Sequence, residues 1–70
     1  MALTFGNIGQ EYKIQGINGN SKSKHFLEKL GFVLEAKIIL ISKNGGNIIV
    51  NVKNSRIAIS KEMANKIIIK

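Results

Sequence analysis

The feature that most restricts the fold of this chain is that its aliphatic residues come in short runs. The longest are Ile38-Ile39-Leu40-Ile41 and Ile67-Ile68-Ile69, which are the length of single strands. Neither approaches the ~20 consecutive apolar residues that a membrane-spanning helix needs. Because β-branched side chains pack well on a pleated surface, these runs predict strands. With 70 residues, the chain has room for one small domain.

Turn and cap residues divide the chain between these runs. Asn20 or Ser21 can cap the start of a helix, and Gly31 stands where a left-handed C-terminal cap belongs. Ser60 can cap one helical turn, in which Glu62 suits the positive end of the helix dipole. The pattern predicts a helix over 22–30, a hairpin loop over 43–47, and strands over 10–17, 36–42, 48–53, 56–59 and 67–69.

These elements predict a mainly β fold, a small five-stranded barrel with one helix after the first strand and a short helical turn before the last. Short strands with both sheet edges in water risk aggregation, and closing into a barrel pairs most of those edges. The helix, with Phe26, Leu27 and Leu30 on one face, would plug one open end. We expect a single domain over 1–70 with a core of Ile14, Leu30, Ile38, Leu40, Ile48, Val50, Val52, Ile57, Ile59 and Ile67.

The residue inventory argues against reaction and metal chemistry. The chain has no Cys and no Asp, and His25 is its one histidine beside four Glu. His25 and Glu28 lie one helical turn apart, but two ligands leave most positions of a ferrous ion to water. The serines lack a His–acid relay, and Gly45-Gly46-Asn47 lacks the Gly-Lys-Ser/Thr ending of a phosphate loop. We therefore expect no catalysis, no metal site and no cofactor.

The charge balance suits an anionic partner. Eleven Lys and Arg residues against four Glu give a formal net charge of +7. Nucleic acid is one possible partner, although one Tyr and three Phe are few for base stacking. A solvated basic face is the other interpretation, because the cations are scattered, form no tract of five, and are nearly all Lys.

Three segments, in this order and spacing, resemble the ferrous iron transport protein A (FeoA) family. The first is Phe26-Leu27-Glu28-Lys29-Leu30-Gly31-Phe32. The second is Ile41-Ser42 followed, after the loop, by residues 46–53, and the third covers residues 55–64. The resemblance extends from about Gly9 to Ile69. The same domain also forms the C-terminal module of some metal-dependent transcriptional repressors.

The resemblance implies an SH3-like barrel in the cytoplasm, peripheral to the inner face of the membrane through its partner. That implied partner is FeoB, the large membrane GTPase that carries ferrous iron inward, and the implied role is accessory or regulatory. The first residues show no secretory signal, which agrees with this expected location. Two alternatives stay open: a small basic barrel that binds nucleic acid, and an adaptor module like that of the repressors.

One position departs from the family pattern. The family usually has Gly before the second strand, where this chain has Glu35 after Leu34. A glutamate would be strained at the positive φ that glycine adopts easily. We therefore expect this turn to be rearranged.

Five residues are predicted contacts with a partner: Lys22, Lys24, His25, Phe32 and Arg56. Lys22, Lys24 and His25 belong to the outward basic face of the helix, where simple solvation is the alternative. Phe32, after the Gly cap, is either an exposed anchor or a core residue, and core packing is favoured. Arg56 either contacts a partner or forms an ion pair with a nearby Glu, which on the surface would contribute little.

Overall fold

The aliphatic runs form five strands in a computed structural model that describes all of residues 1–70. The strands are β1 (Glu11–Ile17), β2 (Lys37–Asn44), β3 (Asn47–Val52), β4 (Ser55–Ser60) and β5 (Ile67–Ile69). The helical segments are η1 (Leu3–Phe5), α1 (Ser21–Lys29) and α2 (Lys61–Ala64). The predicted order is thus confirmed, with α1 after the first strand and α2 before the last. No helix is long and apolar enough to cross a bilayer.

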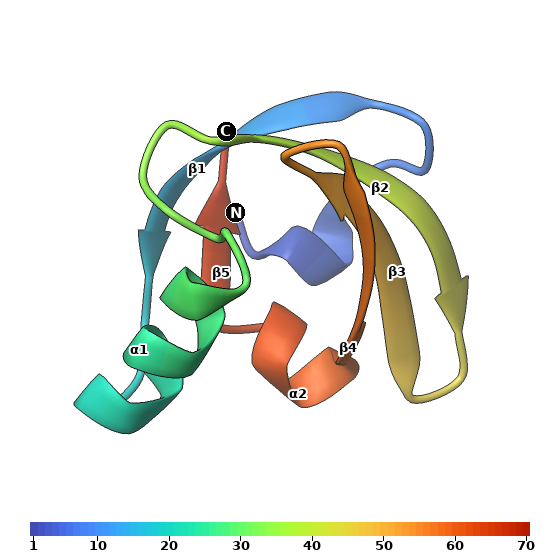
Figure 1. Cartoon of the computed structure of the whole chain (residues 1–70). Helices are drawn as coiled ribbons and strands as arrows, with labels where there is room; N and C mark the ends of the chain where they lie inside the picture. The colour runs from blue at the N-terminus through green and yellow to red at the C-terminus, as the bar shows by residue number, and fades with distance from the viewer.

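The strands form one antiparallel sheet in the order β4-β3-β2-β1-β5. The sheet curls into a partly open barrel, with α1 and α2 at its lower end (Figure 1). The register shifts between Ile14 and Gly16 on β1 and between Leu40 and Ser42 on β2. Such bulges increase strand twist and let a short sheet curl. Because β4 and β5 do not pair with each other, the outer edge of β4 stays open.

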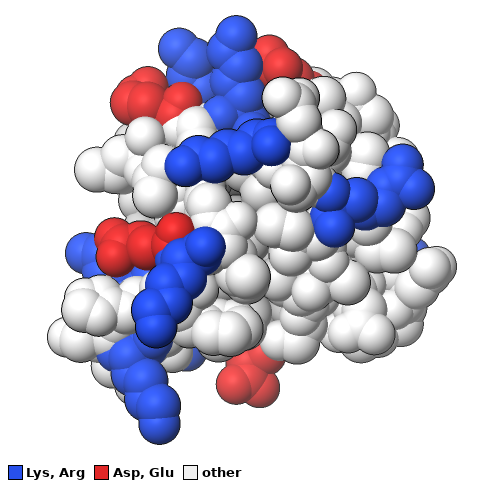
Figure 2. All heavy atoms as spheres, in the orientation of Figure 1, with Lys and Arg blue, Asp and Glu red and all other residues white.

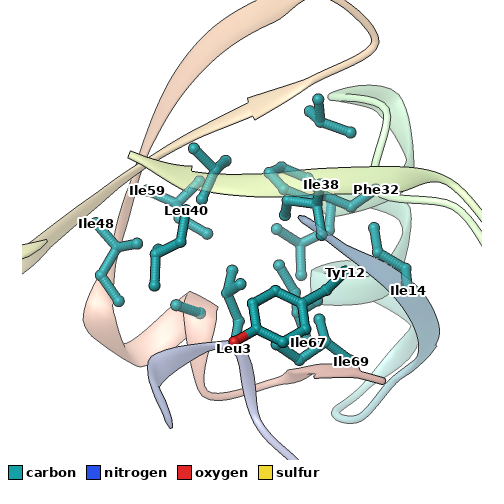
Figure 3. Packing of buried hydrophobic residues seen from close by; sticks show 14 residues of the cluster. Leu3, Tyr12, Ile14, Phe32, Ile38, Leu40, Ile48, Ile59, Ile67 and Ile69 are labelled. Atoms are coloured by element: carbon teal, nitrogen blue, oxygen red, sulfur yellow. The ribbon is translucent and has the colours of Figure 1, made fainter. Parts of the chain in front are cut away.

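The inward side chains form one hydrophobic core (Figure 3). Most of the predicted core is buried as expected, and Leu30 and Ile57 are only partly buried against it. Six further residues complete the core: Leu3, Tyr12, Leu27, Phe32, Ala64 and Ile69.

The sequence predicted both caps of α1 correctly. The Asn20 side chain accepts a hydrogen bond from the Ser23 amide at 2.8 Å. At the C-terminal end Gly31 has φ 105°, and the Phe32 amide donates to the Leu27 carbonyl at 3.1 Å. This is the pattern of a glycine-terminated helix that closes its last turn with a backbone bond. It turns the chain so that Phe32 enters the core.

The rearrangement expected at the turn before β2 is wrong. Glu35 itself adopts φ 68°, in the left-handed region that favours glycine. The turn is fixed on both sides by backbone bonds, because the Glu35 amide donates to the Ile14 carbonyl at 2.8 Å and the Ala36 amide to Val33 at 3.1 Å. These bonds hold a glutamate in a conformation that it would otherwise avoid.

Replacing Glu35 by Gly should therefore stabilise the fold. A left-handed conformation costs an L-residue roughly 1–2 kcal/mol, which glycine does not lose. The greater conformational freedom of glycine in the unfolded chain offsets roughly 0.5–1 kcal/mol of this stabilisation. We expect a net rise of about 0.5 kcal/mol in the free energy of unfolding, measured by urea denaturation. Glu35→Ala is the control, since it removes the carboxylate but keeps the Cβ. If the glycine variant were less stable than the alanine variant, the backbone at position 35 would not be strained.

Candidate docking surface

Helix α1 carries three of the predicted contact residues. Lys22, Lys24 and His25 are all exposed along it. The helix has one fully buried side chain, Leu27, and a polar tether in which Lys66 Nζ donates to Ser23 Oγ at 3.2 Å. The remaining faces of α1 are therefore free to meet another molecule.

An apolar hollow of about 270 Å³ lies between α1 and α2, lined by Lys22, Ser23, Phe26 and Met63. Phe26 is 49% exposed, although the sequence placed it on the inward face of the helix with Leu27. Consecutive helical residues point about 100° apart, so these two neighbours cannot both face the core fully. Leu27 occupies the core position, and Phe26 is left at the surface.

A second hollow, of about 150 Å³, lies on another flank of α1 and is lined by Gly16, Ile17, Lys24, Glu28, Phe32, Val33 and Leu34. Leu34 is 67% exposed beside it. The two flanks thus place exposed apolar side chains next to lysines. We call this set the α1 docking surface: Lys22, Lys24, Phe26, Leu34 and Met63.

The apolar members of the α1 docking surface are not among the contacts that the sequence predicts. Phe26 and Met63 follow the spacing of inward-facing residues, and only their three-dimensional neighbours show that the space between α1 and α2 is not filled. Leu34 precedes Glu35 in a turn whose conformation the sequence did not predict. Exposure alone is not the criterion, because Phe5 is 74% exposed and lines neither hollow.

The two other predicted contacts do not belong to this surface. Phe32 is fully buried, so its assignment as an exposed anchor is wrong and core packing is what the structure has. Arg56 is exposed on β4, opposite Asn51 on β3. It forms no ion pair in this structure. His25 is exposed, and no group of three or more His, Cys, Asp or Glu could hold a metal ion.

A row of lysines crosses one end of the sheet. Lys13 on β1 is directly opposite Lys37 on β2, and its backbone exchanges two hydrogen bonds of 3.0 Å with Lys70. Figure 2 shows basic side chains gathered at the top of the view, where the chain ends and β2 begins. The one ion pair nearby joins Lys70 Nζ to Glu35 Oε1 at 3.9 Å between exposed side chains, so it offsets little of the repulsion.

Reversing one charge in this row should raise stability. Lys37→Glu replaces a like-charged cross-strand pair by an opposite-charged one, which is worth about 0.5–1 kcal/mol. Lys43→Glu is the matched control, because it changes the net charge equally but its cross-strand partner is Ile48. Thermal unfolding at low salt should separate the two variants, and the difference should shrink in salt. Equal effects of the two variants would show that only net charge matters.

Comparison with known proteins shows where this fold occurs. A family model for the FeoA domain matches residues 1–70. No curated protein sequence matches the chain. A crystal structure of an iron uptake regulatory protein (FeoA) is similar with TM-score 0.92 and 22% identity, covering 100% of this chain and 95% of that one.

Two further structures show the same fold. FeoA from Stenotrophomonas maltophilia, a zinc complex described as a prokaryotic SH3 domain protein and candidate ferrous iron transport activating factor, has TM-score 0.87 and 20% identity over 100% of this chain and 89% of that one. A manganese-dependent transcriptional repressor has TM-score 0.91 and 14% identity over 100% of this chain and 35% of its own. The fold is therefore an SH3-like barrel.

Proposed function

This chain belongs to the FeoA family, and from that premise we propose that it is an accessory protein of ferrous iron uptake that docks on the FeoB-type membrane GTPase. The match over residues 1–70 is the observation that carries the proposal. Membership of the family supports a role in ferrous iron transport.

The α1 docking surface supports a protein partner. Phe26 and Leu34 supply exposed apolar area, while Lys22 and Lys24 supply charge next to it. Aromatic side chains at the centre of a contact usually contribute most of the binding free energy, and charges around them increase the association rate and select the partner. An acidic patch with an apolar centre on the GTPase would complement this surface. The chain would then work at the cytoplasmic face of the membrane, held there by its partner.

Co-purification tests this proposal. The chain, carrying an affinity tag, is mixed with the detergent-solubilised full-length GTPase transporter without nucleotide, with GDP and with a non-hydrolysable GTP analogue. We expect the transporter to be retained in at least one of these states. We expect Lys22→Glu combined with Lys24→Glu to reduce retention, with Lys13→Glu combined with Lys37→Glu, on β1 and β2, as a control of equal charge. Absence of association in all three states would contradict the proposal.

Two other functions each have an observation in their favour. The lysine row of Lys13, Lys37 and Lys70 favours a nucleic-acid surface, since phosphate contacts come mainly from such side chains. The similarity to a manganese-dependent repressor favours an adaptor module, although there the fold is a third of a longer chain. A gel shift at low salt separates nucleic-acid binding from the proposed function, because only the former predicts a retarded, salt-sensitive band.

A further inference from the structure

The backbone of β4 has hydrogen-bonding groups without partners. The loop between β3 and β4 has two residues, Lys53 and Asn54, and its flanking residues Val52 and Ser55 are paired. In such a hairpin every second residue bonds to the neighbouring strand. The Lys61 amide donates to the Gly46 carbonyl at 2.8 Å, which fixes the same alternation at the other end.

This alternation assigns each residue of β4 to one side. Ile57 and Ile59 bond to β3, so the amide and carbonyl groups of Arg56 and Ala58 point away from it, toward the open edge. No backbone or side-chain group bonds to either of them there. Both residues are exposed. A strand edge of this kind accepts one further strand through regularly spaced main-chain bonds.

The side chains around this edge indicate what such a strand would carry. Arg56 is the one charged side chain on β4, which has no acidic residue. Arg56 has no ion-pair partner on the outward face of β4, and Ile57 is half-buried on the inward face. An added strand with acidic residues outward and apolar residues inward would match both faces.

We propose that the open edge of β4 receives an extended, acidic segment of the transporter as an additional strand. This inference rests on the proposed function and adds how part of the partner is bound. The edge continues into the α1 docking surface, since α2 follows β4 directly and carries Met63 at the rim of the apolar hollow. A second copy of the chain is a poorer occupant, because pairing two β4 edges would place two Arg56 side chains on adjacent strands that carry no acidic residue.

Hydrogen exchange tests the proposal in the complex with the full-length transporter in detergent. Exchange proceeds in the complex, and the chain is then released and read residue by residue by NMR. The amides of Arg56 and Ala58 should exchange quickly in the free chain and at least about tenfold more slowly in the complex. The amides of Ile57 and Ile59, already bonded to β3, should be slow in both and serve as internal controls. Unchanged exchange at Arg56 and Ala58 in a complex that forms would overturn strand addition while leaving the proposed function standing.

A proline at the edge tests the same bonds by affinity. Ala58→Pro removes an amide that points away from β3, a position where proline is tolerated in edge strands. It should weaken binding about tenfold, whereas Ala58→Val, which keeps the amide, should bind as the unmodified chain does. Equal affinity of the two variants overturns the proposal.

If the proline variant fails to fold, Arg56→Glu provides the test. An acidic strand of the partner would then be repelled by the new carboxylate on β4, so affinity should fall. Unchanged affinity would contradict the proposal that the added strand is acidic. Protection of the edge that rises with chain concentration alone would identify a second copy instead, and absence of any complex overturns both proposals.

Discussion

Replacing Phe32 by Ala should remove about 3–5 kcal/mol from the free energy of unfolding, the largest effect expected of any single change considered. Phe32 is the largest of the fully buried side chains. Its loss combines the lost burial of an aromatic ring with the cavity that remains. A domain of this length has a total stability of roughly 4–10 kcal/mol. Urea denaturation followed by circular dichroism should show a transition shifted to much lower urea, or a chain that is partly unfolded in water.

The matched control is Phe26→Ala, which shortens the same side chain at a position half exposed to water. We expect that variant to unfold within about 0.5 kcal/mol of the unmodified chain, as surface substitutions usually do. If the two variants were equally stable, Phe32 would not be the core residue that its burial indicates, and the interpretation of Phe32 as a partner contact would have to be restored.

Affinity for the transporter should show the opposite ranking of these aromatic residues. Phe26→Ala should weaken binding about 30-fold, equivalent to about 2 kcal/mol, because Phe26 is the one aromatic side chain of the α1 docking surface. Isothermal titration of the solubilised transporter measures this effect. Phe5→Ala is the control, since Phe5 is more exposed than Phe26 but lines neither hollow. Equal losses of affinity for the two variants would indicate nonspecific hydrophobic contact by exposed aromatic residues rather than binding at a defined surface.

Local signals predicted the elements of this fold well. Asn20 and Ser60 cap helices as their side chains indicated, with bonds of 2.8 and 3.1 Å to the amides of Ser23 and Met63. Gly31 ends α1 with a positive φ, as expected. Each of these depends on groups within a few residues along the chain, which is the range over which a sequence pattern is informative.

The long-range features were harder to predict. The open edge of β4 depends on the order of strands in the sheet, which no single strand's pattern reveals. The left-handed conformation of Glu35 is imposed by its bond to Ile14 on another strand, against the local preference of glutamate. The different burial of Phe26 and Leu27 likewise depends on how α1 packs against the rest of the fold, which the helical spacing alone does not indicate. The lysines of the α1 docking surface are therefore among the contacts that the sequence predicts, and its apolar members are not.

Docking through α1 is tested most directly by ferrous iron uptake in cells whose gene for this chain is replaced by the Phe26→Ala form. Uptake of radiolabelled ferrous iron is compared with that of cells carrying the Phe5→Ala form, with the abundance of both proteins and of the transporter checked by immunoblot. If this chain serves iron transport by docking through α1, uptake falls toward that of cells lacking the chain, while Phe5→Ala restores it fully. Full uptake with Phe26→Ala at normal abundance would contradict the account.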